Sequence, residues 1–212
     1  YATDGVPLYD IYQGGFGITP PPNSPWAALN GDFGIELMGH MTRICNLPGD
    51  DFMFRFYVHD PWWANTPWHD RYNDSPHDIY LPMAVSRIDE TGRVRSAEML
   101  NLLSIDNSFG GMPDDCVNET VPHLLKAEKD AADAPAPLVW VYPMREYTTS
   151  ESEEVLREMY LGDNYIRSAI SAGLPLNCVV STDNFLKTDL SVYRKSILIS
   201  PIPETEEVAD KL

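Results

Sequence analysis

Bulky apolar side chains fall at every second position in one stretch of the first half of this chain, and two further stretches there are short and mainly apolar. The stretch Phe52 to Val58 alternates in this way, which predicts a strand. Ile79 to Ile88 predicts a further strand, Asp89 to Gly92 (DETG) a hairpin turn, and Val94 the start of the return strand. Met99 to Ile105 (MLNLLSI) predicts a buried strand.

Two other stretches of the first half have residue patterns that fit a helix. Residues 33 to 45 (FGIELMGHMTRIC) are apolar, and their spacing fits either a short helix or a strand. Asp114 to Lys129 predicts a helix, because acidic residues lie in its first turn, an apolar stripe follows, and lysines lie near its end. Pro122 must then lie near the start of that helix, since proline breaks a helix interior.

From residue 138 the pattern changes to alternating strands and helices. Buried strands are predicted at Leu138 to Tyr142 (LVWVY), Leu176 to Val180 and Ser196 to Ser200. One or two helices are predicted between Ser150 and Ala172, ended by Gly173. Strands joined by helices in this order predict an α/β fold with parallel pairing and right-handed crossovers.

The segment 130 to 137 (DAADAPAP) has the composition of a linker. It divides the chain into an irregular, strand-containing part at 1–137 that is rich in aromatic residues, and a strand–helix–strand domain at 138–212. Further strands are expected beyond Leu212. We therefore expect the second domain to be partial and the chain to be a piece of a longer protein.

The charge and composition exclude several classes of function. A net charge of −17 argues against nucleic acid and against an anionic membrane surface, because both need clustered lysine and arginine. The sequence contains no apolar run long enough to cross a membrane. Three widely spaced cysteines, Cys45, Cys116 and Cys178, fit neither a zinc site nor a disulfide framework, and they predict small buried side chains.

The stretch from Met53 to Val85 concentrates most of the candidate chemistry. It carries three of the five tryptophans and three of the five histidines, interleaved with carboxylates and an arginine. A loop of this length is uncommon unless it is functional or disordered, and its aromatic content argues against disorder. The side chains predicted to bind substrate are Trp62, Trp63, Trp68, His59, His69, Asp70 and Arg71.

Two interpretations of these side chains stay open. In the functional one, the indole rings are platforms for sugar rings, and the histidines and carboxylates bind hydroxyl groups or transfer protons. In the structural one, the indoles pin a long loop to the core, the charges are solvated, and Arg71 only pairs with Asp70 or Asp74. A third possibility is a metal site built on His59, Asp60 and His69, which would need three or four convergent ligands.

Carboxylates follow several of the predicted strands and supply the catalytic candidates. Asp60 and Asp106 each lie just after a strand, and Glu146 follows Leu138 to Tyr142. Glycoside hydrolysis needs two carboxylates that flank the scissile bond, one as acid and one as base or nucleophile. Asp60 with Asp106 is the predicted pair, with Glu146 in reserve. Aspartate is also common at strand ends for local turn-forming reasons, which is the structural alternative.

Three stretches resemble the class I glutamine amidotransferase-like domain that is appended to some barrel glycosidases of the β-galactosidase type. They are PLVWVYP (137–143), AISAGLPLNCVVSTDNF (169–185) and VYRKSILISPIP (192–203), which together lie in the last third of the chain. The resemblance implies a flavodoxin-like parallel sheet that is non-catalytic, because the chain has no G-x-C-x-G elbow. It also implies a larger, barrel-containing parent protein.

The sequence therefore predicts a carbohydrate-active protein, glycoside hydrolase-like if it is an enzyme. A non-catalytic sugar-binding or scaffold portion of a larger glycosidase-like protein is the first alternative, and a metal-dependent hydrolase is the second. The expected partners are a carbohydrate ligand and either a second copy of the chain or the rest of a parent chain. No cofactor is expected, and the cytoplasm is slightly favoured as the location.

Overall fold

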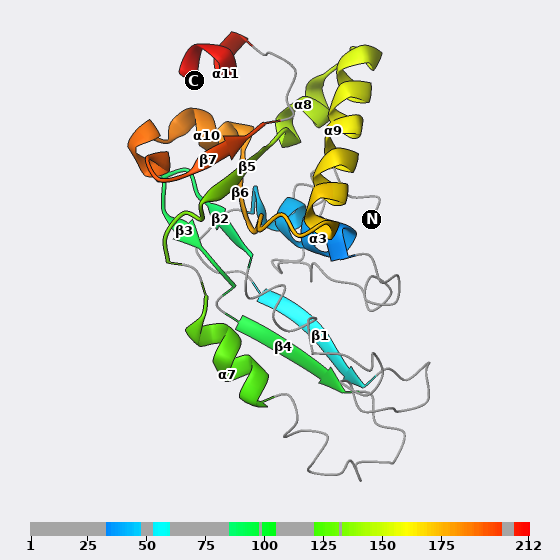
Figure 1. Ribbon diagram of the computed structural model, residues 1–212, viewed down its shortest axis with the longest axis vertical. Coiled ribbons are helices and arrows are strands. Elements are labelled where there is room, and N and C mark those ends of the chain that lie inside the picture. The colour runs from blue at the N-terminus through cyan, green and yellow to red at the C-terminus, as the bar shows by residue number, and fades with distance from the viewer. Residues whose placement is uncertain are drawn as a thin grey trace, which may run out of the picture.

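The computed structural model describes residues 33–47, 53–59, 85–97, 99–104, 121–131, 133–200 and 206–212. These residues form a five-stranded mixed sheet with helices and a separate two-stranded sheet (Figure 1). In chain order the elements are α3 (Phe33–Ile44), β1 (Met53–His59), β2 (Ser86–Ile88), β3 (Val94–Arg95), β4 (Met99–Ser104), α7 (Val121–Lys129), β5 (Leu138–Tyr142), α8 (Met144–Thr149), α9 (Glu153–Ser171), β6 (Cys178–Ser181), α10 (Thr182–Lys187), η1 (Leu190–Tyr193), β7 (Ile197–Ile199) and α11 (Glu206–Lys211).

The larger sheet has the strand order β3-β2-β6-β5-β7. Strand β6 pairs in parallel with β2 and with β5, and β5 pairs in parallel with β7, whereas β3 is antiparallel to β2. The predicted α/β class and parallel pairing are therefore confirmed at this general level. The sheet draws strands from both sides of the predicted boundary at residue 137, and that boundary stays a prediction.

Each strand of the sheet centre is buried on both faces. In β5, Trp140 and Tyr142 join a core shared with α3 and α9, whereas Val139 and Val141 join a second core with α10, η1 and α11. All four side chains are at most 1% exposed. Because successive side chains of a strand point to opposite faces, this alternation places α9 and α10 on opposite sides of the sheet.

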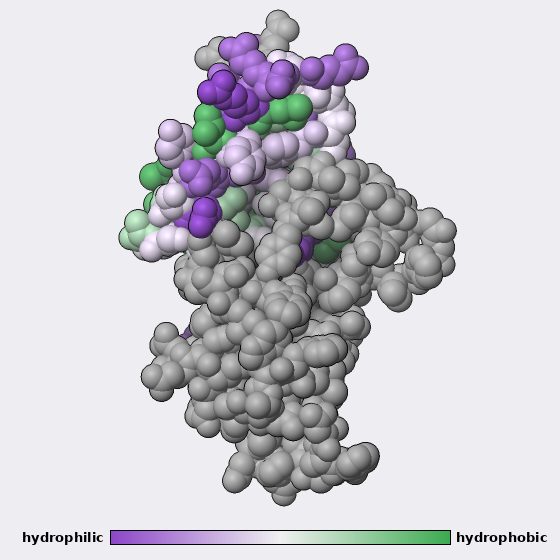
Figure 2. All heavy atoms as spheres, turned by 90° about the vertical axis from the view of Figure 1, so that its right-hand side faces the viewer, coloured by the Kyte–Doolittle hydropathy of each residue, from purple (hydrophilic) through white to green (hydrophobic). Residues whose placement is uncertain are grey.

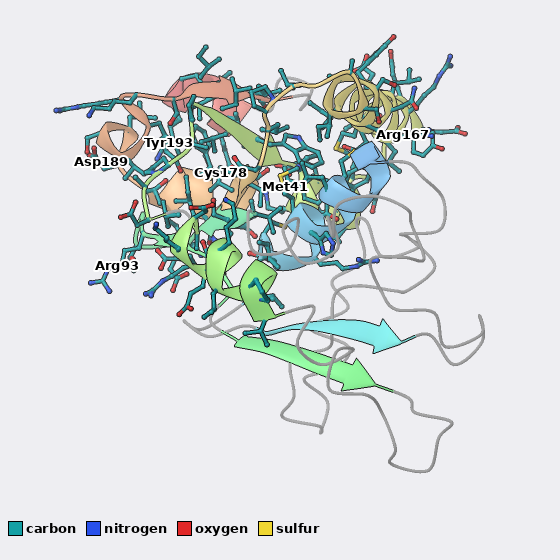
Figure 3. The ribbon with its side chains drawn as sticks, turned by 60° about the horizontal axis from the view of Figure 1, so that its bottom comes forward. Met41, Arg93, Arg167, Cys178, Asp189 and Tyr193 are labelled. Carbon is teal, nitrogen blue, oxygen red and sulfur yellow. The ribbon has the colours of Figure 1, made fainter. Side chains whose placement is uncertain are left out.

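The interior and the rim of this domain differ clearly in side-chain character. Figure 3 shows Met41 and Cys178 in the interior, while Arg93 and Asp189 lie toward the periphery. Met41 and Cys178 are fully buried. The side of the molecule that carries α9 is mainly hydrophilic in its described part, with small hydrophobic patches (Figure 2).

Helix α3 resolves the ambiguity of residues 33 to 45 in favour of a helix. Its residues Leu37, Met41 and Ile44 lie at helical spacing and are buried in the core with α9. The two helices approach closely at Gly34, whose backbone N–H donates to the Ser171 hydroxyl at 3.2 Å. Packing against the sheet and α9, rather than local preference, therefore fixes the helical form of this stretch.

Helix α9 follows the sequence signals closely. Ser152 caps its first turn by accepting a hydrogen bond from the backbone N–H of Val155, and acidic Glu153 and Glu154 follow. Gly173 lies just past its end with a φ of 101°, a conformation that favours glycine. The structure also contains helices α8 and α10, which the sequence pattern did not predict because each has only six residues.

The predicted hairpin is formed by β2 and β3. At its turn, Asp89 is 3% exposed and accepts hydrogen bonds from the backbone N–H and the hydroxyl of Thr91, the backbone N–H of Arg93 and the side chain of Arg95. Burial alone would raise the pKa of Asp89, but these hydrogen bonds together lower it from 3.8 to about 2. The Asp89 carboxylate therefore stabilises the turn through these hydrogen bonds.

Replacing Asp89 by asparagine should destabilise the protein by about 2 kcal/mol at neutral pH. The folded-state pKa lies below the unfolded value, so the stabilisation is complete above about pH 5 and is lost as the pH falls toward 2. Urea unfolding of both proteins between pH 7 and pH 3 measures the difference. A difference that does not shrink on acidification would contradict this role.

The smaller sheet consists of β1 and β4, which pair in parallel from Met53 opposite Met99 to His59 opposite Ser104. The register is irregular between Tyr57 and His59. Both strands lie where the sequence predicts strands, but their parallel partnership was not predicted. Among the described helices, none has the length and apolar character needed to cross a membrane.

Candidate functional site

Most of the sequence-predicted site residues lie outside the described part of the chain. These are Asp60, Trp62, Trp63, Trp68, His69, Asp70, Arg71 and Asp106. Their assignment stays a prediction. Two predicted site residues fall within described elements: His59, the last residue of β1, and Glu146 in α8.

The two sheets each have a carboxyl edge at which polar residues gather. In the smaller sheet, His59 and Ser104 end β1 and β4 as register partners. Because the two strands are parallel, their carboxyl ends lie side by side. Asp60 follows His59 directly in the sequence, and Asp106 follows Ser104 by two residues.

In the larger sheet, the neighbouring strands β5 and β6 continue into connections on opposite faces. Strand β5 leads through α8 to α9 on one face, and β6 leads to α10 on the other. The two crossovers also run in opposite directions, because β6 lies on one side of β5 and β7 on the other. The strand order thus reverses at β5, and the topological switch point lies between β5 and β7. Open α/β sheets bind ligands at such a point, just outside the carboxyl ends of the strands.

Glu146 lies at this switch point and is 5% exposed. Its Oε2 accepts a hydrogen bond from the hydroxyl of Thr182, the first residue of α10, at 2.8 Å. The Thr182 oxygen also lies 3.3 Å from the backbone carbonyl of Tyr142 at the end of β5. The carboxylate of Glu146 thus joins the two connections that leave β5 and β6, and this position favours a structural role.

Arg145, the neighbour of Glu146, is surrounded by three carboxylates. Its Nη2 lies 3.2 Å from Oε1 of Glu146 and 2.8 Å from Oε2 of Glu207 in α11, and its Nη1 lies 3.8 Å from Oδ1 of Asp183. Burial alone would lower the pKa of Arg145, but Glu207, Glu146 and Asp183 together raise it above its ordinary value. Among the described residues, the guanidinium of Arg145 therefore faces three carboxylates.

Further polar side chains hold the strand ends in place. Ser181, the last residue of β6, accepts from the backbone N–H of Asn184 and donates to Oδ1 of Asn46. Asn184 donates from Nδ2 to the carbonyl of Ile88 at the end of β2, at 3.2 Å. Sequence reasoning noted Asp183 as a carboxylate at a strand end but did not predict the roles of Ser181, Thr182 and Asn184, although four small polar residues directly after the predicted strand were the available signal.

Helix α8 is braced from its other side by Tyr147. The Tyr147 hydroxyl donates to Oδ2 of Asp163 in α9 at 2.6 Å, and its ring lies 5.9 Å from that of Tyr142. Together with the Glu146–Thr182 contact, this fixes the position of Arg145 at the carboxyl edge.

The buried cysteines and His40 contribute structure to this domain. Cys178 and Cys45 are fully buried free thiols, as predicted, and burial raises the pKa of Cys178. A buried thiol with a raised pKa is a poor nucleophile. His40 is also buried, and its burial followed by the charge of Arg43 lowers its pKa to about 3. Within the described residues, no group of three or more potential ligands is arranged to hold a metal ion.

Comparison with known proteins adds no relative: no family model, no curated protein and no solved structure matches this chain. The resemblance to amidotransferase-like domains of glycosidases therefore stays a prediction that rests on the sequence motifs.

Proposed function

We propose that this protein is a carbohydrate-active, glycoside hydrolase-like protein that cleaves glycosidic bonds with the carboxylates of Asp60 and Asp106. The observation that carries the proposal is the parallel pairing of β1 and β4, which ends with His59 beside Ser104. Two carboxylates that follow the carboxyl ends of neighbouring parallel strands form the kind of pair that glycoside hydrolysis requires.

The dimensions of a parallel sheet support this pairing. Neighbouring strands lie about 4.8 Å apart, and catalytic carboxylates of glycosidases are separated by roughly 5 to 9.5 Å. Residues that follow two adjacent strand ends can therefore span a glycosidic bond without any large rearrangement of the sheet. The tryptophan-rich stretch Trp62 to Trp68 begins two residues after Asp60, and indole rings would supply the apolar faces that sugar rings need.

The charge distribution favours a neutral ligand over an anionic one. The chain carries a net charge of −17, and among the described residues the guanidinium of Arg145 faces three carboxylates. A neutral sugar avoids the repulsion that a phosphate or nucleic acid would meet.

The proposed role of residues 138–212 is that of a non-catalytic, amidotransferase-like domain. Three features support it: the parallel order of β6, β5 and β7, the buried thiol of Cys178, and the engagement of Glu146 by Thr182. A non-catalytic sugar-binding or scaffold role for the whole chain is the second candidate. It is favoured because the carboxylate of Glu146 accepts a hydrogen bond from Thr182 and so has a structural role. A metal-dependent hydrolase is the third, and metal analysis of the purified protein tests it.

Replacing Asp60 or Asp106 by alanine should lower kcat/KM on a 4-nitrophenyl glycoside by at least about a hundredfold, because one member of an acid–base pair is lost. A panel of 4-nitrophenyl glycosides identifies the sugar, and calorimetry with the corresponding free sugar measures binding. Asp133→Ala, which changes an exposed aspartate in the linker, is the matched control.

The outcomes separate the candidates. Loss of turnover with binding retained supports the hydrolase. Binding of a free sugar without turnover of any glycoside in the panel supports the scaffold, and unchanged turnover in both variants rejects the Asp60–Asp106 pair.

A further inference from the structure

The C-terminal helix α11 contacts both of the connections that leave β5 and β6 in the larger sheet. Its Glu207 pairs with Arg145 of α8, at the start of the connection that leaves β5. Its Lys211 donates to the carbonyls of Leu186 and Thr188 at the end of α10, in the connection that leaves β6, at 2.9 and 2.6 Å. Figure 1 shows α11 above α10, at the same end of the molecule as α8.

Among the residues that the structure describes, a small set of contacts holds α11 in this position. Val208 is its one buried side chain among those described, and it joins the core that contains Phe185. Lys211 also lies over the Phe185 ring, 5.5 Å from its centroid. The other described side chains of the helix, at 207, 209 and 210, face solvent. The polar contacts at its two ends therefore supply a large share of what keeps α11 in place.

A helix of six residues has little stability of its own in water. Segments with one buried apolar side chain and solvent-facing ion pairs belong to the parts of a protein that open locally at low cost. The domain beneath α11, in contrast, has two cores that include the fully buried Trp140 and Phe185. Local opening of α11 can thus occur while the sheet stays folded.

We propose that α11 is a strap over the carboxyl ends of β5 and β6, closed by the Arg145–Glu207 ion pair and able to open without unfolding of the sheet. Opening removes one of the three carboxylates around Arg145 and leaves its guanidinium anchored by Glu146, which Thr182 holds in turn. The switch point then presents a fixed, solvent-facing arginine to a ligand. This regulatory device is independent of the glycosidase proposal, which concerns the other sheet.

Hydrogen–deuterium exchange of the full chain, followed by mass spectrometry, tests the strap without any ligand. Glu207→Gln keeps the shape of the side chain and removes its charge, and Asp210→Asn makes the same change elsewhere on α11. We expect Glu207→Gln to speed exchange in residues 206–212 by about two- to fivefold, the range of a partly exposed ion pair. Asp210→Asn should leave it unchanged, and exchange in α9 should stay unchanged in both variants.

Salt provides a second measurement of the same contact. At about 1 M sodium chloride, screening should speed exchange of α11 in the wild type but have little further effect in Glu207→Gln. Unchanged exchange in Glu207→Gln would overturn the proposal, because the pair would then not close the strap. Equal acceleration in α9 and α11 would also overturn it, because α11 would then open only with the whole domain.

Discussion

Replacing Gly34 by alanine should destabilise the protein by about 3 kcal/mol, the upper range for overpacking of a tight core. A Cβ at this position would lie 2.2 Å from the backbone carbonyl oxygen of Arg167 and 2.6 Å from the Ser171 hydroxyl oxygen. The carbonyl belongs to α9 and cannot move without shifting that helix. The added methyl group would therefore push α3 away from α9 and loosen the core that they share with β5 and β6.

Gly39 in the same helix provides a matched control. A Cβ there would lie 3.5 Å from the nearest atom, Nη1 of Arg43, which is ordinary contact distance. Gly39→Ala should therefore stabilise the protein by about 0.5 to 1 kcal/mol through helix propensity alone. Urea unfolding followed by tryptophan fluorescence measures both variants. Similar stabilities for the two would show that α3 and α9 are not in close contact at Gly34.

Replacing Glu146 by alanine should cost about 3 kcal/mol, the scale for removing one member of a buried charged pair. The change removes the acceptor of the Thr182 hydroxyl and the innermost of the carboxylates around Arg145. Glu146→Gln keeps an acceptor for Thr182 and should cost only about 1 kcal/mol. Glu158→Ala, at an exposed position of α9, serves as the control and should change stability little.

The two Glu146 variants also decide between a structural and a catalytic role. If the carboxylate only fixes α8, Glu146→Gln keeps turnover on the active glycoside within about threefold, because the geometry is preserved. If Glu146 is a catalytic acid or base, the same variant loses at least about a hundredfold in kcat/KM with nearly normal stability. The measurement is kcat/KM together with the free energy of unfolding for each variant.

The sequence was sufficient for features that depend on neighbouring residues. The continuous apolar run LVWVY predicted β5 at its observed bounds, and Ser152 and Gly173 marked the ends of α9 within a few residues. The turn before Val94 was likewise predicted from its own residues, Asp89 to Gly92. Local chemistry decides these features, since a capping hydroxyl or a turn carboxylate needs no distant partner.

The sites depended much more on contacts between distant segments. Glu146 was singled out because it follows a strand, but its partner Thr182 is 36 residues away. The three carboxylates around Arg145 come from α8, α10 and α11, and no spacing in the sequence brings them together. The pairing of β1 with β4, 40 or more residues apart, was also invisible in the pattern of either strand.

By itself, the sequence of this protein determined its α/β character, the strands and their parallel pairing in the last third, the ends of α9, and a net charge of −17. The tertiary structure alone decided that residues 33–44 form a helix, that β2 completes the sheet beside β6, and that Glu146 and Arg145 lie at a switch point under α11. The physical reason is that apolar spacing specifies what a segment buries, whereas strand order and the meeting of charged groups depend on which buried faces fit together.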